Sequence, residues 1–192
     1  LDAQIYLRSN LTLNLTFNPD FGQVEVDPAV MNLSAAETYY QEKRPFFLEQ
    51  ASTFRFGRGG SNRNISANWA EPTMFYSRRI GRPPRGMVSG DGFVDIPEWT
   101  TIIGAAKLTG QLLPGLNIGF LGALTGREFA SIDGGGDRWR REIEPRTGYS
   151  VLRVMKEMDG GRRALGFMGT AAVRAAIDKY RASITALADY AD

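Results

Sequence analysis

Two glutamates bracket a short charged run of this 192-residue chain, and by residue type they are its candidates for acid–base chemistry. The run EKRPFFLE begins at Glu42 and ends at Glu49, and Glu37 precedes it. Paired carboxylates hydrolyse glycosidic bonds when one acts as an acid and the other as a nucleophile or base. The chain has 21 acidic residues, however, so such pairs arise often, and nothing in the spacing fixes their separation. We therefore predict no catalytic residue, and a non-enzymatic protein is the favoured interpretation.

The composition removes several other kinds of chemistry. The sequence has no cysteine and no histidine, which excludes disulfides, thiolate metal sites and the side chain that most often serves as a general base. The glycine-rich stretches GRGG and DGGGDR lack the strand–loop–helix context of a phosphate-binding loop. The formal net charge of +2 is too small to indicate a nucleic-acid binder. We predict no metal, no cofactor and no nucleic-acid partner.

The EKRPFFLE run has two further interpretations, because two signs of charge surround its apolar centre, residues 45–48. In one, the segment folds into the lumen of a β-barrel as a plug or constriction, where charges set the selectivity of a pore. In the other, it is a hydrophobic clip flanked by solvated ion pairs, which contribute little stability. For the plug we expect the charges of the run to pair with lumen-facing Arg78, Arg79 or Arg82. The candidate charge cluster therefore consists of Glu42, Lys43, Arg44, Glu49, Arg78, Arg79 and Arg82.

A second basic run, RWRR at residues 138–141, surrounds Trp139. Tryptophan and arginine together suit contact with lipid headgroups or sugars. A solvated loop is the simpler interpretation of the same residues.

The elements that would position these residues are extended. Residues 11–17, LTLNLTF, alternate strictly, so leucines share one face of a strand and Thr and Asn share the other. We predict one strand over 3–17, a turn at 18–22 and a short partner strand at 23–28. A soluble sandwich or a barrel wall between lipid and water would give this alternation.

Two long hairpins follow, and 73–80 is predicted as a weaker strand. Residues 100–109 should pair with 116–127, and 149–158 with 162–173 across Asp159-Gly160-Gly161, a strong hairpin signal. These strands, about 10–12 residues long, exceed the five or six residues usual in soluble sheets and suit the 9–11 of membrane barrels. We count about seven strands, so a closed barrel would need strands outside residues 1–192.

We divide this single domain into four parts. Residues 1–28 form the first hairpin, 29–72 an inserted loop or plug, and 73–173 the later hairpin strands. Residues 174–192 fit both helical spacing and strand alternation, and we favour a helix. The chain begins at Leu1 without an initiator Met, which indicates a piece of a longer protein.

Several segments, in order, resemble one uncharacterised family. The longest is residues 18–57, from NPDFGQVEVDP to STFRFG, and the EKRPFFLE run inside it is specific. FYSRRIGR, TTIIGAAKLTG, LTGRE and the Glu144-Pro145 pair before Tyr149 follow, so the resemblance covers residues 3–173. Gln41 and Gln50 depart from the family pattern, which has Pro and Gly there. In this family a carbohydrate-binding module of family 9 precedes a long C-terminal domain of unknown function, and this chain resembles the N-terminal part of that domain.

The resemblance implies an outer-membrane β-barrel of a Gram-negative bacterium. The expected fold is therefore all-β, an antiparallel meander of long hairpins forming part of a transmembrane barrel with a long inserted plug. The expected partners are the lipid bilayer, a carbohydrate and other subunits that complete the sheet, and the expected role is passage or surface handling of polar solutes. The alternatives are a soluble or surface-attached β domain that binds or hydrolyses glycans, and a structural subunit of a larger assembly. We expect Leu13→Arg to destabilise a lipid-facing position and Asn14→Arg to be tolerated in a wet lumen.

Overall fold

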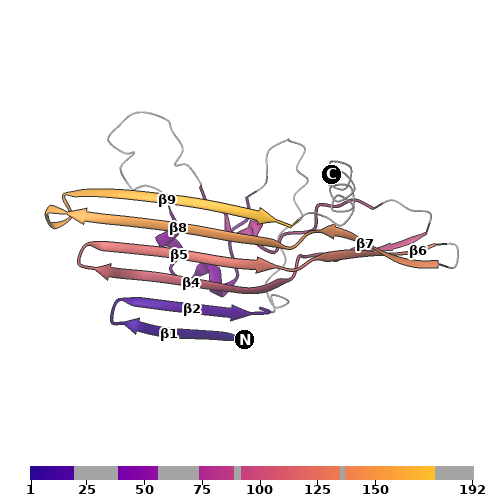
Figure 1. Ribbon diagram of the computed structural model, residues 1–192, viewed down its shortest axis with the longest axis horizontal. Coiled ribbons are helices and arrows are strands. Elements are labelled where there is room, and N and C mark those ends of the chain that lie inside the picture. The colour runs from indigo at the N-terminus through magenta and orange to yellow at the C-terminus, as the bar shows by residue number, and fades with distance from the viewer. Residues whose placement is uncertain (20–38, 56–73, 89–91, 135–136, 176–192) are drawn as a thin grey trace, which may run out of the picture.

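The computed structural model describes residues 1–19, 39–55, 74–88, 92–134 and 137–175. This part of the chain is mostly strand (Figure 1). The strands are β1 (Asp2–Arg8), β2 (Leu11–Phe17), β3 (Phe93–Asp95), β4 (Ile102–Leu113), β5 (Leu116–Thr125), β6 (Glu128–Gly134), β7 (Asp137–Glu144), β8 (Thr147–Met158) and β9 (Arg163–Arg174). The helical segments are α1 (Pro45–Leu48) and the 3₁₀ turns η1 (Ala51–Phe54), η3 (Ser77–Arg79) and η4 (Asp159–Gly161). Among these described residues, no helix has the length and apolar character needed to cross a membrane.

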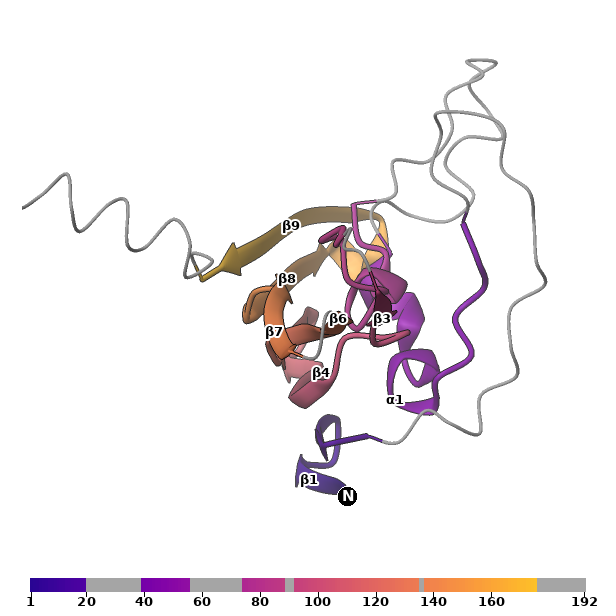
Figure 2. The same cartoon turned by 90° about the vertical axis from the view of Figure 1, so that its right-hand side faces the viewer.

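Six strands form one antiparallel sheet in the order β1-β2-β4-β5-β8-β9. The predicted all-β, antiparallel class is confirmed, and so are both long hairpins. β4 pairs with β5 across Pro114-Gly115, and β8 pairs with β9 across η4. The sheet curves, and in the described residues it does not close, since β1 and β9 are its two edge strands (Figure 2).

A smaller sheet, β3-β6-β7, projects from one end of the large sheet, and we call these three strands the arm (Figure 1). Only Gly126-Arg127 separate β5 from β6, and only Pro145-Arg146 separate β7 from β8. The arm therefore continues the β5–β8 strand pair beyond the ends of these two strands. The interpretation of the RWRR run as a solvated loop was wrong, because the run lies within β7, where Trp139 pairs with Ile132.

The first predicted strand is two strands. A turn at Ser9-Asn10 reverses the chain, and β1 pairs antiparallel with β2. Ile5 lies opposite Leu13 and Tyr6 opposite Thr12, so odd-numbered residues share one face on both sides of the turn. The alternation therefore continues through the reversal and gives no sign of it. The predicted partner strand at 23–28 lies outside the described residues.

Two other predictions fall on the remaining segments. The described part of the weak strand predicted at 73–80 contains η3 instead, because the carbonyls of Ser77 and Ile80 accept hydrogen bonds from Arg44 rather than from a neighbouring strand. The predicted C-terminal helix lies almost entirely outside the described residues, and β9 extends to Arg174. The structure likewise describes only parts of the predicted insert, residues 39–55 of 29–72.

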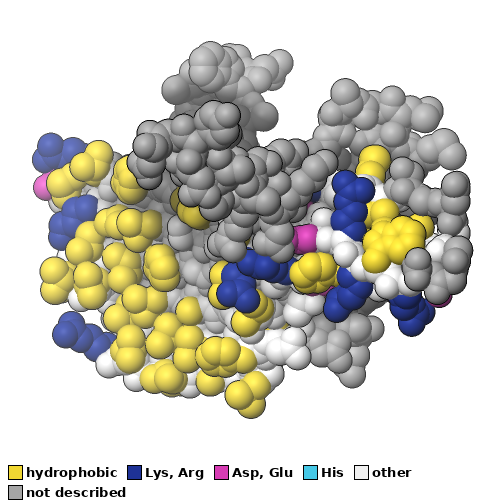
Figure 3. Space-filling model, turned by 45° about the vertical axis from the view of Figure 1, so that its right-hand side comes forward, with side chains coloured by type: hydrophobic (Ala, Val, Ile, Leu, Met, Phe, Trp, Pro, Cys, Tyr) yellow, Lys and Arg dark blue, Asp and Glu magenta, His cyan; other side chains and the backbone are white. Residues whose placement is uncertain are grey.

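One face of the large sheet is apolar and open, and we call it the outer face. The register of the strands places leucine, isoleucine, valine and phenylalanine side chains next to one another across all six strands. Its exposed members include Ile5, Phe17, Phe120, Leu124, Leu152, Leu165, Phe167 and Val173. They form a broad hydrophobic patch with Lys and Arg side chains at its margin (Figure 3).

The opposite, inner face is covered by the chain itself. Residues 40–55 and 74–86, which we call the clip, place α1 and η1 against the concave side of the sheet (Figure 2). Buried side chains of the clip and of β4, β5, β8 and β9 make one core. Its members are Phe46, Phe47, Phe54, Ile80, Ile102, Ala105, Leu121, Ala123, Val151 and Met168. The protein core therefore lies on one side of the sheet, although both sides carry apolar residues.

Gly119 shows how closely the clip approaches β5. A Cβ atom built on Gly119 would lie 2.6 Å from Cγ2 of Thr53 and 3.3 Å from the Phe54 ring. We expect Gly119→Val to displace η1 and to speed amide exchange across residues 51–55 by at least tenfold. Gly148→Val in β8 is the control, because a Cβ there meets no atom within 4 Å. Equal protection of residues 51–55 in both variants would contradict the packing described.

Candidate functional site

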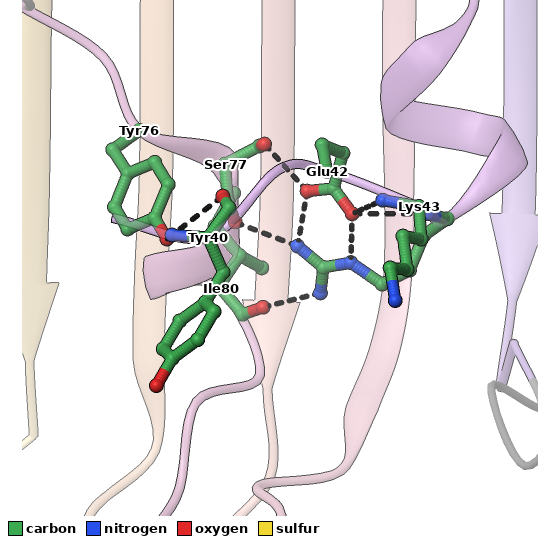
Figure 4. Close-up of polar contacts among 7 residues, drawn as sticks. Tyr40, Glu42, Lys43, Tyr76, Ser77 and Ile80 are labelled. Atoms are coloured by element: carbon green, nitrogen blue, oxygen red, sulfur yellow. Dashed lines mark hydrogen bonds and ion pairs between the residues drawn. The ribbon is translucent and has the colours of Figure 1, made fainter. Parts of the chain in front are cut away.

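The centre of the clip is an ion pair between two neighbours in the chain, Glu42 and Arg44 (Figure 4). The Glu42 carboxylate accepts hydrogen bonds from Nε and Nη2 of Arg44, both at 2.7 Å. It also accepts from the Ser77 hydroxyl at 2.5 Å and from the backbone N–H groups of Lys43 and Arg44. Arg44 is 6% exposed, and its remaining donors reach the carbonyls of Ser77 and Ile80. The pair thus joins the two halves of the clip.

The electrostatics of Glu42 follow from these bonds. Burial raises the pKa of this carboxyl, but the hydrogen bonds and positive charge of Arg44, together with the Ser77 hydroxyl, outweigh burial. The net result is a pKa below the usual value of 4.5, so Glu42 is ionised at neutral pH. The Arg44 guanidinium also lies 4.3 Å from the centroid of the Phe47 ring, which couples the ion pair to the hydrophobic core.

A second polar group fixes the clip to β2 and β4. Nδ2 of Asn14 donates to the Glu49 carboxylate at 2.6 Å. The ammonium group of Lys107, which is 1% exposed, donates to the backbone carbonyls of Phe46 and Glu49. Asn14 of β2 and Lys107 of β4, which alternate with leucines, therefore bind the clip instead of lining open water.

A third group lies where the clip meets the arm. Nη2 of Arg82 donates to the Glu144 carboxylate at 2.7 Å, and the other oxygen of Glu144 accepts from the backbone N–H of Arg85. Burial lowers the pKa of Arg82, and the charge of Glu144 opposes that shift. The Arg82 carbonyl accepts two hydrogen bonds from Thr100, so this residue links β7 to the segment that leads into β4.

The predicted cluster is thus brought together in part. Glu42, Arg44 and Glu49 contact the inner face or the second half of the clip, and Arg82 lies at the arm. Lys43 donates its backbone N–H to Glu42, and Arg78 and Arg79 belong to η3. We expected the charges of the run to pair with Arg78, Arg79 or Arg82. The main ion pair of Glu42 is instead with Arg44, two residues away in the sequence.

Four residues of the site were not predicted: Asn14, Ser77, Lys107 and Glu144. Lys107 had a signal in the sequence, because it is the one charged residue in the strand IIGAAKLTGQLL. A lysine alone in an apolar strand must reach acceptors on its own face, and the carbonyls of the clip provide them. The sequence analysis singled out Glu144 only as part of the Glu144-Pro145 pair that supports the family resemblance.

Comparison with models of known protein families identifies the family of this chain. The family model described as "Domain of unknown function (DUF5916)" matches residues 1–190. The chain belongs to this DUF5916 family. No curated protein and no solved structure matches it. The family carries no established activity to transfer, so the function of this DUF5916 chain has to be argued from its own residues.

The DUF5916 clip offers little for acid–base catalysis. Of the three carboxylates considered for glycoside hydrolysis, Glu37 lies outside the described residues. Glu42 and Glu49 accept hydrogen bonds from the protein's own side chains. Among the described residues no group of three or more acidic side chains is arranged to hold a metal ion. The bonds of the cluster attach two loop segments to the inner face of the sheet.

Acid should release this attachment. The pKa of Glu42 is lower in the folded state than in the unfolded chain, so its ionised form stabilises the clip above the unfolded pKa and this contribution is lost as pH falls through the folded value. We expect amide exchange in residues 44–49, corrected for intrinsic rates, to accelerate between pH 5 and pH 3. Glu42→Gln should expose these amides already at pH 7 and flatten the pH dependence. The same steep response in Glu42→Gln as in the parent chain would contradict this assignment.

Proposed function

We propose that this chain is part of the wall of a membrane-embedded antiparallel β-barrel, with the outer face in contact with lipid. The observation that carries the proposal is the open apolar face across all six strands, where Phe167 and Val173 are 62% and 72% exposed (Figure 3). Soluble proteins rarely leave a large contiguous apolar surface in water. A bilayer makes the same surface favourable.

The distribution of polar residues between the two faces of the sheet also supports a membrane wall. In a soluble sheet with one covered face, the uncovered face is polar. Here the covered face holds Asn14, Lys107 and Thr109 together with the core, whereas the uncovered face holds leucine and phenylalanine. A sheet with its polar residues on the covered side is expected for a barrel wall that encloses a plug.

The connections also differ at the two ends of the sheet. At one end the chain reverses within a few residues, at Ser9-Asn10, at Pro114-Gly115 and at η4. At the other end it runs through the clip between β2 and β4, and through the arm between β5 and β8 (Figure 1). Outer-membrane barrels have short periplasmic turns and long outer loops, which supports an outer membrane as the location; in this proposal the arm is on the outer side.

The solute is a further part of the proposal. A barrel with a clip on its inner face would hold a narrowed lumen, and charges such as Arg153 on the inner face of β8 would act on polar solutes that enter it. Passage or surface handling of a polar solute, with carbohydrate as the candidate class, is the role we propose for this lumen.

A second candidate function, a structural subunit, follows from the edges of the sheet. β1 and β9 are both edge strands in the described residues, and β9 has 12 residues whose pairing partner on one side is β8. Long open edges pair readily with other strands. Such an assembly would bury backbone edges but would leave the outer face exposed, so the membrane wall explains more of the structure.

Partitioning tests the proposal. The chain is refolded by diluting it from detergent into phosphatidylcholine vesicles, and the vesicles are floated on a density gradient before and after an alkaline wash. We expect the chain to float, to resist the wash and to migrate differently on gels when it is not boiled. A chain that stays monodisperse and monomeric in buffer without detergent contradicts the proposal. Discrete assemblies that form without lipid would favour the structural subunit.

A further inference from the structure

We propose that the inner face carries a binding site for small anionic solutes where the sheet meets the arm. The site consists of Arg82, Arg85 and Arg174, which we call the arginine cluster. This inference rests on the proposed function, because it needs the inner face to line a lumen that solutes enter. It names the charge of the solute, which the barrel wall by itself leaves open.

Separate segments of the chain bring the arginine cluster together. Arg82 and Arg85 belong to the clip, and the Glu144 carboxylate at the end of β7 accepts from Nη2 of Arg82 and from the backbone N–H of Arg85. Arg174 is the last residue of β9 and lies opposite Thr147, the first residue of β8. The three arginines therefore meet at the junction of the clip, the arm and the β8–β9 hairpin.

The register places Arg174 on the inner face. Tyr149 of β8 lies opposite Ala123 of β5, and both residues belong to or pack against the core on that face. Thr147 is two residues before Tyr149, so Thr147 and its partner Arg174 share this face. Arg174 is exposed, so its guanidinium borders the space in front of the inner face and is open to a solute there.

The electrostatics of Arg82 show that the arginines are neighbours. Burial lowers the pKa of Arg82, the charge of Glu144 opposes this shift, and the positive charges of Arg85 and Arg174 lower the pKa further. Repulsion between charges weakens with distance and with solvent screening. Arg85 and Arg174 must therefore lie near Arg82, although they are far apart in the sequence.

The cluster carries more positive charge than its one carboxylate neutralises. The side chain of Glu144 is 5% exposed and is already bound to Arg82. The side chains of Arg85 and Arg174 form no hydrogen bond or ion pair with the residues that the structure describes. Three positive charges against one negative charge leave a surplus of two.

The other described carboxylates near the junction do not pair with the cluster. Glu142 is 5% exposed and lies 4.0 Å from Arg127, and Glu128 accepts from the backbone N–H of Thr101. Glu98 is exposed between β3 and β4 and forms no ion pair within the described part of the chain. The remaining described carboxylates of the arm lie farther along it, opposite Ser131 and Phe93, and are Asp95 and Asp133. The surplus at the cluster therefore remains available to an anion.

The side chains of this site suit an oxyanion. Guanidinium groups bind phosphate or carboxylate oxygens with two donors at once. Tyr149, whose charge state also acts on Arg82, has a hydroxyl with no hydrogen-bond partner among the described residues, and it can donate to the same anion. Arginines that line a pore favour anions, phosphate among them. A polar solute that carries a phosphate group is therefore the ligand class we assign to the cluster.

The test compares two solutes that differ in a phosphate group. The isotope-labelled chain in an amine-oxide detergent is titrated with glucose 6-phosphate and with glucose at constant ionic strength, and its backbone amides are followed by NMR. We expect saturable shifts at residues 82–86, 147–149 and 172–174 with glucose 6-phosphate and none with glucose. Inorganic phosphate is titrated as a second anion: equal affinity identifies the free oxyanion as the ligand, and weaker affinity identifies the phosphorylated solute. Both results support the anion site.

The matched variants remove equal charge at two places. Arg85→Gln/Arg174→Gln should weaken the binding of glucose 6-phosphate about tenfold or more, because each guanidinium lost removes a charge-assisted hydrogen bond. It leaves the pair of Arg82 and Glu144 in place. Arg162→Gln/Arg163→Gln, at the other end of the β8–β9 hairpin, is the control and should bind as the parent chain does.

The outcomes separate this inference from the proposed function. Equal shifts with glucose and glucose 6-phosphate, an unchanged affinity in Arg85→Gln/Arg174→Gln, or an equal loss in the control overturns the inference. Flotation with phosphatidylcholine vesicles reads the barrel wall separately. A chain that floats but does not bind glucose 6-phosphate keeps the wall and overturns the anion site. Binding that persists in a chain that does not float supports the anion site and contradicts the wall.

Discussion

Replacing Phe120 with arginine is expected to lower the free energy of unfolding from a bilayer by about 2–4 kcal/mol. Phe120 lies near the middle of β5 on the outer face, opposite Leu108 of β4 and Leu152 of β8. An arginine there would have to bring its charge to the depth of the hydrocarbon core, between the apolar side chains of Leu108 and Leu152. In water the same change should cost little, because Phe120 is already exposed.

The matched control is Leu113→Arg, at the end of the same hairpin. Leu113 is exposed and pairs with Leu116 beside the Pro114-Gly115 turn, so an arginine there can reach the headgroups. The expected cost is about 0–1 kcal/mol. Both values come from reversible denaturant unfolding of the chain in phosphatidylcholine vesicles. A similar cost at the two positions, or no cost at either, would remove the main support for a lipid-facing wall.

The expected tolerance of Asn14→Arg has to be revised in light of the structure. The alternation of β2 correctly assigns Asn14 to the face opposite the leucines, but that face is occupied by the clip. Asn14 is 6% exposed and donates to Glu49, so an arginine there has no room and would push α1 away. Leu13, on the outer face, keeps its expected sensitivity. Periodicity therefore tells which residues share a face, and it does not tell what covers that face.

Local patterns made part of the fold predictable. The β8–β9 hairpin follows from Asp159-Gly160-Gly161 between two alternating runs, because Gly160 and Gly161 adopt the positive φ that the turn needs. The turn between β1 and β2 could not be found in the same way, since Ser9-Asn10 preserves the alternation across the reversal. The arm was missed because its strand β7 is mostly charged, and a charged strand resembles a solvated loop in sequence.

The site was predictable as a cluster but not as a set of contacts. Charges of both signs around two phenylalanines indicated a segment that packs and pairs, and the structure puts Phe46 and Phe47 in the core with Arg44 beside them. The partners come from long sequence distances: Ser77 for Glu42, Asn14 for Glu49, and the carbonyls of Phe46 and Glu49 for Lys107. Such pairs depend on how the clip lies across β2 and β4, which no local pattern specifies.

Arg44→Met is expected to have the largest effect on the clip. It leaves the Glu42 carboxylate buried without its guanidinium and frees the carbonyls of Ser77 and Ile80, and breaking a buried ion pair from one side costs about 3–5 kcal/mol. Arg163→Met is the control, because its partner Asp159 is on the surface and such a pair contributes about 0–1 kcal/mol. Denaturant unfolding in detergent gives the total loss in the free energy of unfolding for each variant. Amide exchange in residues 44–49 shows whether this stability is lost in the clip.

The double variant Glu42→Gln/Arg44→Met distinguishes the charge from the packing. Without the carboxylate no buried charge is left unpaired, so the double variant should recover part of the stability that Arg44→Met loses, even though two side chains have changed. Methionine replaces the contact of the Arg44 guanidinium with the Phe47 ring by a sulfur–aromatic contact. If the double variant is instead less stable than Arg44→Met by the full cost of a second independent change, Glu42 acts through Ser77 and the backbone donors, and the ion pair is not what joins the two halves of the clip.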